Sequence, residues 1–405
     1  MEKHRPLEGL VVLDFTRVYS GPYCTVLLAD LGAEVIKVER EKIGDDSHDY
    51  LPIQKGHESG YYMLYNRNKK SIELNLKNPA AQNIIYDIVK NVDIVVENFA
   101  PGVAAKLGID YDTLSKYNDK IVYASISGFG QTGPYRNKAA YDIIAQAMGG
   151  YMSVTGEPGD RPLKLGTSIA DATAGIHAAF AILAGIIYRN NTGIGQYIDI
   201  SMQDCVFTTM ENVMMLKLLG GLHPTREGNR NKGAAPFNTY PTKDGKFVCV
   251  AVANDAMFYR CMEAMDMPQY NSDPRFMGNK GRKDNEDLLD ELVEGWTKQH
   301  DLDYICKKLD EYKVPGSPVL SVDEVVEDEQ LLSRGMIVEM NHSVEGKIKM
   351  PGSPFKYSKT KIDTFESSPL LGENTCEILE KYANYTEDDI RTLYSEGTIF
   401  QSPDN

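Results

Sequence analysis

Short apolar runs that favour β-strands alternate with helical stretches through the first third of the chain. The strand-like runs cover residues 10–14, 35–39, 93–97 and 121–125. Helical stretches follow at residues 25–31 and 80–90, the second opened by Asn78-Pro79 as an N-cap and first helical residue. This alternation predicts βαβ units, and therefore an α/β fold with a parallel sheet covered by helices.

The turn after the first predicted strand does not have the glycine pattern of a dinucleotide site. It reads Thr16-Arg17-Val18-Tyr19-Ser20-Gly21-Pro22. Nicotinamide and flavin enzymes of this architecture place GxGxxG there, because the pyrophosphate must approach the backbone closely. The turn therefore does not predict a dinucleotide cofactor.

A chain of 405 residues is longer than one hydrophobic core usually organises, so two domains are expected. After apolar helices predicted for residues 171–188 and 202–220, a stretch rich in Gly, Asn, Arg and Pro suggests a linker. A polar helix is expected within residues 369–395. We predict a large domain that begins with residues 1–220, a linker and small domain at 221–330, and a returning C-terminal segment at 331–405.

The charge and cysteine pattern exclude several classes of function. The formal net charge is −15, which disfavours nucleic acid and anionic membrane surfaces as partners. The six cysteines have no CxxC spacing, so neither a metal site nor a disulfide framework is predicted. We find no secretory signal and no run approaching about 18 uncharged apolar residues, which predicts a cytoplasmic protein without a membrane span.

One acidic residue interrupts the small and apolar residues from Gly166 to Gly175. This residue, Asp171, precedes a run from Ile176 to Ile187 that predicts a buried helix, so it would lie on the first helical turn, where negative charge is favoured. Taken alone, the position suits an N-capping aspartate as well as a placed catalytic carboxylate.

The segment resembles the class III coenzyme A (CoA) transferase family, also called the CaiB/BaiF family, whose members include formyl-CoA transferases. Four further blocks carry the resemblance, in the family's order and spacing, at residues 12–22, 32–40, 66–77 and 128–134. It covers nearly the whole chain, and Asp171 matches the family's catalytic aspartate.

The resemblance implies a fold and a reaction. The fold is a Rossmann-like large domain beside a smaller α+β domain, with two chains interlocked as a homodimer. The reaction moves CoA from an acyl-CoA donor to a carboxylic acid acceptor through an aspartyl anhydride and an aspartyl-CoA thioester. Asp171 would be the nucleophile. No permanently bound cofactor or metal is implied, and the CoA thioester is itself the substrate.

The resemblance also implies a set of binding residues. Asp142, which follows Tyr141, would support Asp171 or simply cap a helix. The first turn would lie beside the thioester, and Tyr61 near the acyl group. The residues on family positions for substrate or CoA are Arg17, Val18, Tyr19, Ser20, Arg40, Tyr61, Leu74, Lys77, Asn98, Phe99, Lys106 and Tyr141.

Two alternatives remain open on this fold. The 2-methylacyl-CoA racemases of the superfamily have His where this chain has Tyr141, so an isomerase would need another proton-exchanging group. A CoA-binding regulatory protein with an incidental Asp171 is the non-catalytic alternative. Within the transferases, residues 228–236 contain no consecutive glycines, unlike the glycine run of oxalate-using members. The donor and acceptor are not identified by the sequence.

Overall fold

The computed structural model describes residues 5–56 and 58–401, which divide into two compact units. The first unit contains the chain up to Tyr151, Lys164–Gly221 and the chain from Gln330 onward. The second contains Met152–Leu163 and Leu222–Glu329. Residues 152–163, which we expected in the large domain, group with the second unit because their backbone is bonded there: the N–H of Gly228 donates to the carbonyl of Gly156 at 3.0 Å.

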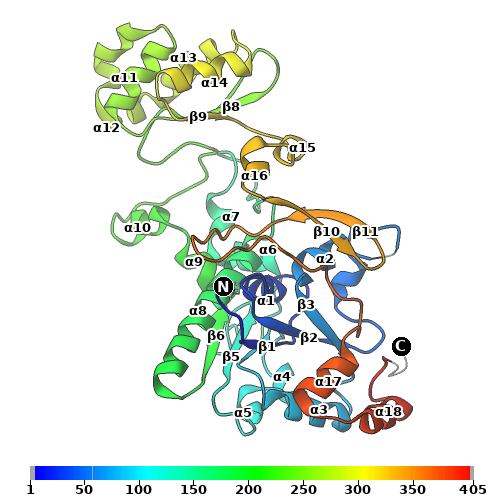
Figure 1. Cartoon of the computed structure of the whole chain (residues 1–405). Coiled ribbons are helices and arrows are strands. Elements are labelled where there is room, and N and C mark those ends of the chain that lie inside the picture. Colours follow the sequence, from blue (N-terminus) through cyan, green and yellow to red (C-terminus); the bar gives the residue numbers. More distant parts are fainter. Residues whose placement is uncertain (1–4, 57, 402–405) are drawn as a thin grey trace. The chain divides into compact units, whose positions relative to one another are not determined.

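A six-stranded sheet is the centre of the first unit (Figure 1), and all its strand pairs are parallel. The strand order is β3-β2-β1-β4-β5-β6, which is the doubly wound order of Rossmann-like folds. The strands are β1 (Val11–Asp14), β2 (Glu34–Arg40), β3 (Lys69–Leu74), β4 (Ile94–Glu97), β5 (Val122–Ser127) and β6 (Gln196–Ser201). The predicted parallel α/β sheet is therefore confirmed.

Both faces of this sheet are buried, because successive side chains of a strand point to opposite faces. Leu13, Ile36 and Val95 belong to one core, which also contains residues of α3 (Pro79–Val89) and α17 (Thr375–Ala383). Val12, Val35 and Val96 belong to the other core, with residues of α1 (Ser20–Asp30), α6 (Asp142–Gly149), α8 (Ile169–Thr192) and α9 (Met202–Thr208). The Asn78 side chain caps α3 by accepting from the N–H of Ala80 at 3.0 Å.

The polar C-terminal helix packs on this sheet. Ile378 and Leu379 of α17 are buried in the same core as β1 and β2. Lys381 pairs with Glu34 at 2.7 Å, and the N–H of Gly372 donates to the Ser71 hydroxyl at 2.9 Å. The remaining elements of the first unit and its borders are α2 (Gly60–Asn66), α4 (Val103–Lys106), α5 (Tyr111–Leu114), α7 (Tyr151–Val154), α10 (Asn212–Leu218), α16 (Glu329–Ser333), α18 (Glu387–Ser395), β10 (Ile337–His342) and β11 (Gly346–Pro351).

The second unit has its own antiparallel sheet and its own core. The sheet has the order β7-β8-β9, from Phe237–Pro241, Phe247–Ala251 and Gly316–Pro318. Tyr240, Phe258 and Trp296 are among the buried residues. The helices are α11 (Asp255–Ala264), α12 (Gly278–Asp284), α13 (Glu286–Thr297), α14 (Leu302–Glu311) and α15 (Val322–Val325).

Helix α8 corrects one expectation from the sequence. It is 24 residues long, and by length and composition alone it could cross a membrane, although we expected no such run. The small residues Ala174, Ala178 and Gly185 are buried against the rest of the unit. Helices of soluble cores pass the same length and composition test, so this finding is weak evidence for a span.

Candidate active site

The turn between β1 and α1 lies at the carboxyl edge of the sheet, where parallel α/β folds bind ligands. Asn98, just after β4, holds this turn from the neighbouring strand. Its side-chain oxygen accepts from the N–H of Arg17 at 2.8 Å, and its amide donates to the carbonyl of Arg17 at 2.8 Å. The adjacent Val18 has a φ of 67°, a left-handed conformation that is rare for a β-branched residue.

A cavity of about 470 Å³ opens beside this turn. Of the residues predicted to bind CoA or substrate, it is lined by Arg17, Arg40, Leu74, Lys77 and Phe99. Asn98 and Lys106 do not line it; Asn98 instead holds the turn, and Lys106 ends the short helix α4. The structure therefore brings together residues at or just after the carboxyl ends of β1, β2, β3 and β4, which are widely separated in sequence.

The cations of the cavity have partners that an anionic ligand could exchange. Arg17 forms an ion pair with Asp46 at 3.2 Å, and Arg40 forms an ion pair with the same carboxylate. Asp46 is partly exposed. The guanidinium of Arg17 also lies 5.4 Å from the centre of the Phe99 ring. Its Nε is buried without a hydrogen-bond partner in the part of the chain that the structure describes. The sequence pattern did not indicate Asp46. It lies among other acidic residues, and such a group is typical of a solvent-exposed surface.

Asp171 lies on the first turn of α8, and a second carboxylate performs the capping role that we considered for it. Asp142, the first residue of α6, accepts from the N–H of Ala170 at 2.8 Å and of Asp171 at 3.3 Å. Gln146, one turn along α6, donates to the other oxygen of Asp142 at 2.5 Å. Because Asp142 supplies the cap, the Asp171 carboxylate is not needed for it.

The environment of Asp171 shifts its titration toward neutrality. Burial and the nearby negative charge of Asp142 raise its pKa from 3.8 to about 7, while hydrogen bonding by the Ser20 side chain opposes the rise. Ser20 is the first residue of α1, so it connects the turn beside the cavity to Asp171. A carboxyl group that titrates near neutrality can change between a proton-holding and a nucleophilic form at working pH.

Tyrosine rings gather around this carboxylate. The rings of Tyr19 and Tyr65 are 4.5 Å apart, and those of Tyr61 and Tyr65 are 5.1 Å apart. Burial, with a contribution from the Asp171 charge, raises the pKa of Tyr65 to about 12 and raises the pKa values of Tyr19 and Tyr61 further. These phenols therefore stay protonated and can donate hydrogen bonds.

Two members of this tyrosine cluster, Tyr65 and Tyr23, were not among our sequence candidates. The ring of Tyr23 is 5.6 Å from that of Tyr19. The spacing of Tyr61 and Tyr65, four residues apart on α2, was the available signal, because such residues share a helix face. Tyr141, by contrast, was a candidate and is 80% exposed. Its charge when ionised would act on Tyr50, so it lies near the outer edge of the cluster.

The described residues contain no group of three or more His, Cys, Asp or Glu side chains arranged to hold a metal. All six cysteines are free, and Cys24 and Cys261 are buried with raised pKa values. The groups that the structure places at this site are a carboxylate, phenols, and the cations of the cavity.

Comparison with known proteins identifies the family of this chain. Residues 7–375 match the family described as CoA-transferase family III. Succinyl-CoA:glutarate CoA-transferase of Mus musculus is 35% identical over 98% of this chain and 91% of its own length. Succinyl-CoA–D-citramalate CoA-transferase of Chloroflexus aurantiacus is 35% identical over 98% of both chains.

A solved structure extends the agreement to the fold. A CaiB/BaiF family protein from Brucella suis has 34% identity and a TM-score of 0.83, covering 94% of this chain and all of the other. The family match spans most of the chain and the two relatives are aligned almost end to end, so neither is a partial domain match. This chain belongs to the class III CoA-transferase (CaiB/BaiF) family, and it is an enzyme of the transferase class.

Proposed function

We propose that this enzyme moves CoA from an acyl-CoA to a free carboxylic acid, with Asp171 as the nucleophile. One observation carries the proposal: the turn from Arg17 to Ser20 lines the cavity at one end and contacts Asp171 at the other. A thioester whose CoA portion occupied the cavity would therefore extend toward the tyrosine cluster and the carboxylate.

The proposed transfer needs no oxidation or reduction. The Asp171 carboxylate attacks the thioester carbonyl, which releases the CoA thiolate and forms a mixed anhydride. The thiolate attacks the aspartyl carbonyl of the anhydride, which releases the donor acid and forms an aspartyl-CoA thioester. The acceptor carboxylate then attacks this thioester, which releases the CoA thiolate and forms a second mixed anhydride. The thiolate attacks the acceptor acyl carbonyl of that anhydride, and the aspartate carboxylate leaves. Asp171 is regenerated, and acceptor acyl-CoA leaves.

We propose a short dicarboxylate or a related hydroxy acid as the acyl class. The names of the two relatives above both contain succinyl-CoA. The protonated phenols of Tyr19, Tyr61 and Tyr65 are suitable donors for a distal carboxylate. Oxalate is not the acid that we expect, because residues 228–236 lack consecutive glycines.

We propose that the working enzyme is a cytoplasmic homodimer whose chains interlock. Helix α8 supports the dimer, because it presents exposed apolar side chains at Ile176, Phe180 and Ile187. These residues are four and seven positions apart, so they lie along one side of the helix. A large exposed apolar stripe favours coverage by another protein surface.

Isotope exchange tests transfer against racemisation on the same fold. A 2-methylacyl-CoA and the enzyme are incubated in D2O with and without an acceptor acid, and the thioesters are read by mass spectrometry. Transfer requires the acceptor and leaves the α-carbon untouched, whereas racemisation must exchange the α-proton with solvent. We expect a new thioester only with acceptor and no α-deuteration. Rapid α-deuteration without acceptor would overturn the transferase proposal.

A second arm uses a panel of donors and acids to identify the acyl class. Succinyl-CoA should be a donor to other dicarboxylic acids, and oxalate should be a poor acceptor. If only monocarboxylic aromatic acids were accepted, the dicarboxylate proposal would be wrong while the transferase proposal would stand. If no donor and acid pair exchanged CoA, although the protein bound CoA, a regulatory binding role would replace both.

A further inference from the structure

Asp45 is a buried carboxylate directly beneath the turn that joins β1 and α1, and nothing in the steps above uses it. We propose that Asp45 is a positioning residue, an inference that rests on the proposed function. Together with Lys37, Asp45 holds the strained Thr16–Ser20 turn so that Ser20 and Tyr19 face Asp171. Asp45 also lines the cavity, but its side chain is almost inaccessible to solvent, so it acts through the turn and touches neither the acyl group nor Asp171.

The turn needs an anchor because its conformation is unfavourable for its sequence. Val18 has a φ of 67°, and a branched Cβ makes the left-handed region costly. Such conformations persist only when the surrounding structure holds them, and they gather at active sites. The side chain of Thr16 also approaches α1 so closely that a Cβ at Gly21 would be 2.3 Å from the Thr16 Cβ.

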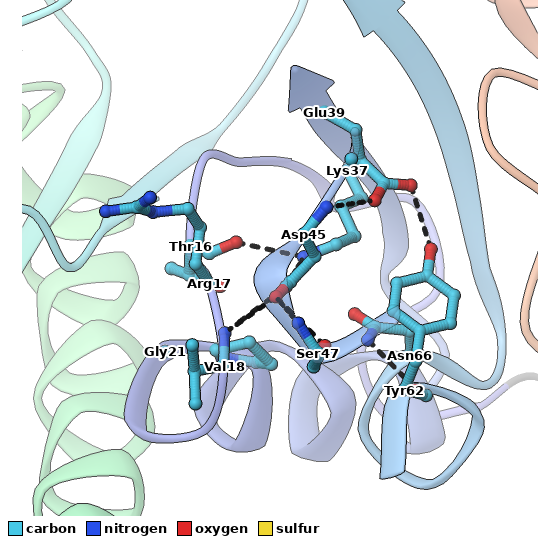
Figure 2. A network of polar contacts seen from close by, with 12 residues as sticks. Thr16, Arg17, Val18, Gly21, Lys37, Glu39, Asp45, Ser47, Tyr62 and Asn66 are labelled. Atoms are coloured by element: carbon cyan, nitrogen blue, oxygen red, sulfur yellow. Dashed lines mark hydrogen bonds and ion pairs between the residues drawn. The ribbon is translucent and has the colours of Figure 1, made fainter. Parts of the chain in front are cut away.

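Asp45 supplies the anchor at Val18 (Figure 2). One carboxylate oxygen accepts from the N–H of Val18 at 3.0 Å and from the N–H and hydroxyl of Ser47, each at 2.9 Å. The other oxygen accepts from the ammonium of Lys37 at 2.8 Å. Every one of these neighbours is a donor, so only a carboxylate satisfies them all.

Lys37 fixes the same turn at a second point. Its ammonium donates to the backbone carbonyl of Thr16 at 2.9 Å as well as to Asp45. Both side chains of this ion pair are essentially inaccessible to solvent. Burial is the largest influence and opposes the charge on each. The attraction within the pair, the charges of Asp14 and Glu39 near Lys37, and the hydrogen bonds to Asp45 together exceed it, so the pKa of Asp45 is below and that of Lys37 above the ordinary value. The pair is therefore charged across the working pH range.

A second buried pair lies under the first half of the turn. Lys69 donates to Asp14 at 3.0 Å, and the other oxygen of Asp14 accepts from the N–H of Thr16 at 2.9 Å. Thr16 is thus held by Asp14 and Lys37, but Asp45 makes the bond at the strained residue itself. Tyr19 and Ser20 follow the anchored residues directly, as the N-cap and first residue of α1, and both interact with Asp171.

The experiment compares Asp45→Asn with Asp30→Asn. Asp30 is an equally buried carboxylate, bound to Arg67 at 2.7 Å, and contacts neither the turn nor the cavity. In Asp45→Asn the amide N–H₂ must face either Lys37 or Val18, so one of the two contacts is lost together with the negative charge that pairs with Lys37. Both variants should be less stable. We expect kcat of Asp45→Asn to fall at least tenfold at a temperature where it is folded, and kcat of Asp30→Asn to stay within threefold.

The pH profile separates positioning from simple electrostatics. Asp142 and Ser20 shift the pKa of Asp171, and the phenols of Tyr19, Tyr61 and Tyr65 lie close enough that the Asp171 charge raises their own pKa values. Removing the negative charge of Asp45 would by Coulomb's law lower the pKa of Asp171. Displacing Ser20 removes a hydrogen-bond donor and raises it. We therefore expect the acid limb of kcat/KM to move to higher pH in Asp45→Asn and to stay in place in Asp30→Asn.

Glycine at position 18 supplies an internal rescue, since it adopts the left-handed conformation without strain. If the two substitutions acted independently, the fold-loss of kcat in the double variant Asp45→Asn/Val18→Gly would equal the product of the two single fold-losses. We expect the measured fold-loss to be at least threefold smaller than that product. If Asp45→Asn does not fold, Asp45→Glu keeps the charge for Lys37 while moving the carboxylate. It should show the same direction of change in kcat and in the acid limb.

The inference is overturned if Asp45→Asn and Asp45→Glu keep a wild-type kcat and acid limb, or if their losses equal that of Asp30→Asn. It is also overturned if Val18→Gly gives no rescue. The proposed function fails in a different way: wild-type enzyme itself would then show no acceptor-dependent transfer and no covalent adduct on Asp171.

Discussion

Two carboxylates share one helix end in this enzyme, and their roles are divided by geometry. Asp142 accepts from the N–H groups at the start of α8, whereas Asp171 is the third residue of that helix and lies beside Ser20 and the tyrosines. The negative charge of Asp142 makes Asp171 harder to ionise. The cap therefore also tunes the group that we propose as the nucleophile.

Replacing Asp142 by Asn tests this tuning. The amide oxygen can still accept from the N–H of Ala170, but the negative charge is gone, so the pKa of Asp171 should fall from about 7. Because the nucleophile must be ionised, the acid limb of kcat/KM should move to lower pH. Asp142→Ala removes the cap as well and should cost about 1 kcal/mol of stability. An acid limb that stays in place in Asp142→Asn would contradict the assignment.

Asp171→Asn should be more stable than the wild type at neutral and higher pH. The folded chain holds the Asp171 proton with a pKa of about 7, against an ordinary value of 3.8. Between these values the folded state binds more protons than the unfolded state, so the free energy of unfolding falls as the pH rises. The variant avoids this loss, by on the order of 2–4 kcal/mol at about pH 8. Denaturant unfolding at about pH 4 should show little difference.

Sequence patterns identified Asp171 but not the division of labour around it. The Gly166–Gly175 segment marks an acid at a helix start, and capping and catalysis both suit that position. The capping residue lies on another helix, 28–29 residues away along the chain. Tyr23 and Tyr65 were missed for the same reason, since tyrosines in helices are usually read as core. Contacts between distant segments decide these roles, and local patterns do not record them.

At the scale of elements, the approach of α1 to α8 brings Ser20 to Asp171. Gly175 makes the approach possible, because a Cβ there would be 2.7 Å from the carbonyl oxygen of Ser20 and 3.2 Å from the Tyr23 ring. A contact with backbone cannot be relieved by a side-chain rotation. The distance between the two helices is therefore fixed by one residue without a side chain.

Gly175→Ala should consequently destabilise the fold by about 1–3 kcal/mol and reduce transfer. The matched control is Gly295→Ala in α13, where an added Cβ meets nothing within 4 Å. That variant should be unchanged or more stable by about 0.5–1 kcal/mol, because alanine favours a helix interior. Thermal unfolding of the two variants and wild type makes the comparison. Equal stability of both variants would contradict the close helix approach.

The strands of the parallel sheet differ in how clearly the sequence predicts them, and apolar runs are the main signal. The four strands β1, β2, β4 and β5 were expected from short apolar runs, as buried parallel strands require, although Lys37 and Glu39 interrupt the run of β2. Strands β3 and β6 were not, because they lie at the edges and contain charged residues such as Lys69 and Asp199. The charge of Lys69 is buried against Asp14, a compensation that becomes visible only in three dimensions.

At the scale of the whole molecule, an acidic chain concentrates a few cations around one cavity. The formal net charge is −15, and the cavity that Arg17, Arg40 and Lys77 line also has the carboxylates of Glu39, Glu41 and Asp45 in its wall. A polyanionic nucleotide would therefore have to take Arg17 and Arg40 from their present partner, Asp46. The binding of CoA should therefore depend strongly on this small cluster.

Arg40→Ala should weaken CoA binding by about tenfold, as expected for loss of a charged hydrogen-bond donor. Lys106→Ala should have the smaller effect, because Lys106 does not line the cavity although its sequence position suggested a CoA contact. Added salt should weaken the wild-type complex by screening these charges. Titration calorimetry with CoA measures all three. Unchanged affinity in Arg40→Ala would mean that the nucleotide binds elsewhere.

Domain organisation is the part of the whole molecule that sequence patterns resolved least completely. Composition marked the change of texture after residue 220, and the second unit does contain the segment that follows. Residues 152–163 belong to that unit too, although the surrounding helices belong to the first. Residues 152–163 are held in the second unit by contacts such as the hydrogen bond that Arg226 donates to the carbonyl of Asp160. No local sequence pattern indicates such a contact.

In the proposed mechanism Asp171 carries first the acyl group and then CoA as covalent adducts. Wild-type enzyme incubated with acyl-CoA is treated with hydroxylamine or borohydride, digested with trypsin and analysed by mass spectrometry. The peptide of residues 165–189 contains Asp171 as its one acidic side chain, so any adduct on it is located without ambiguity. We predict modification of this peptide only when acyl-CoA is present, and none in the folded but inactive Asp171→Asn. An unmodified peptide in wild-type enzyme that is turning over, or transfer near the wild-type rate by Asp171→Asn with deamidation excluded, would contradict the account.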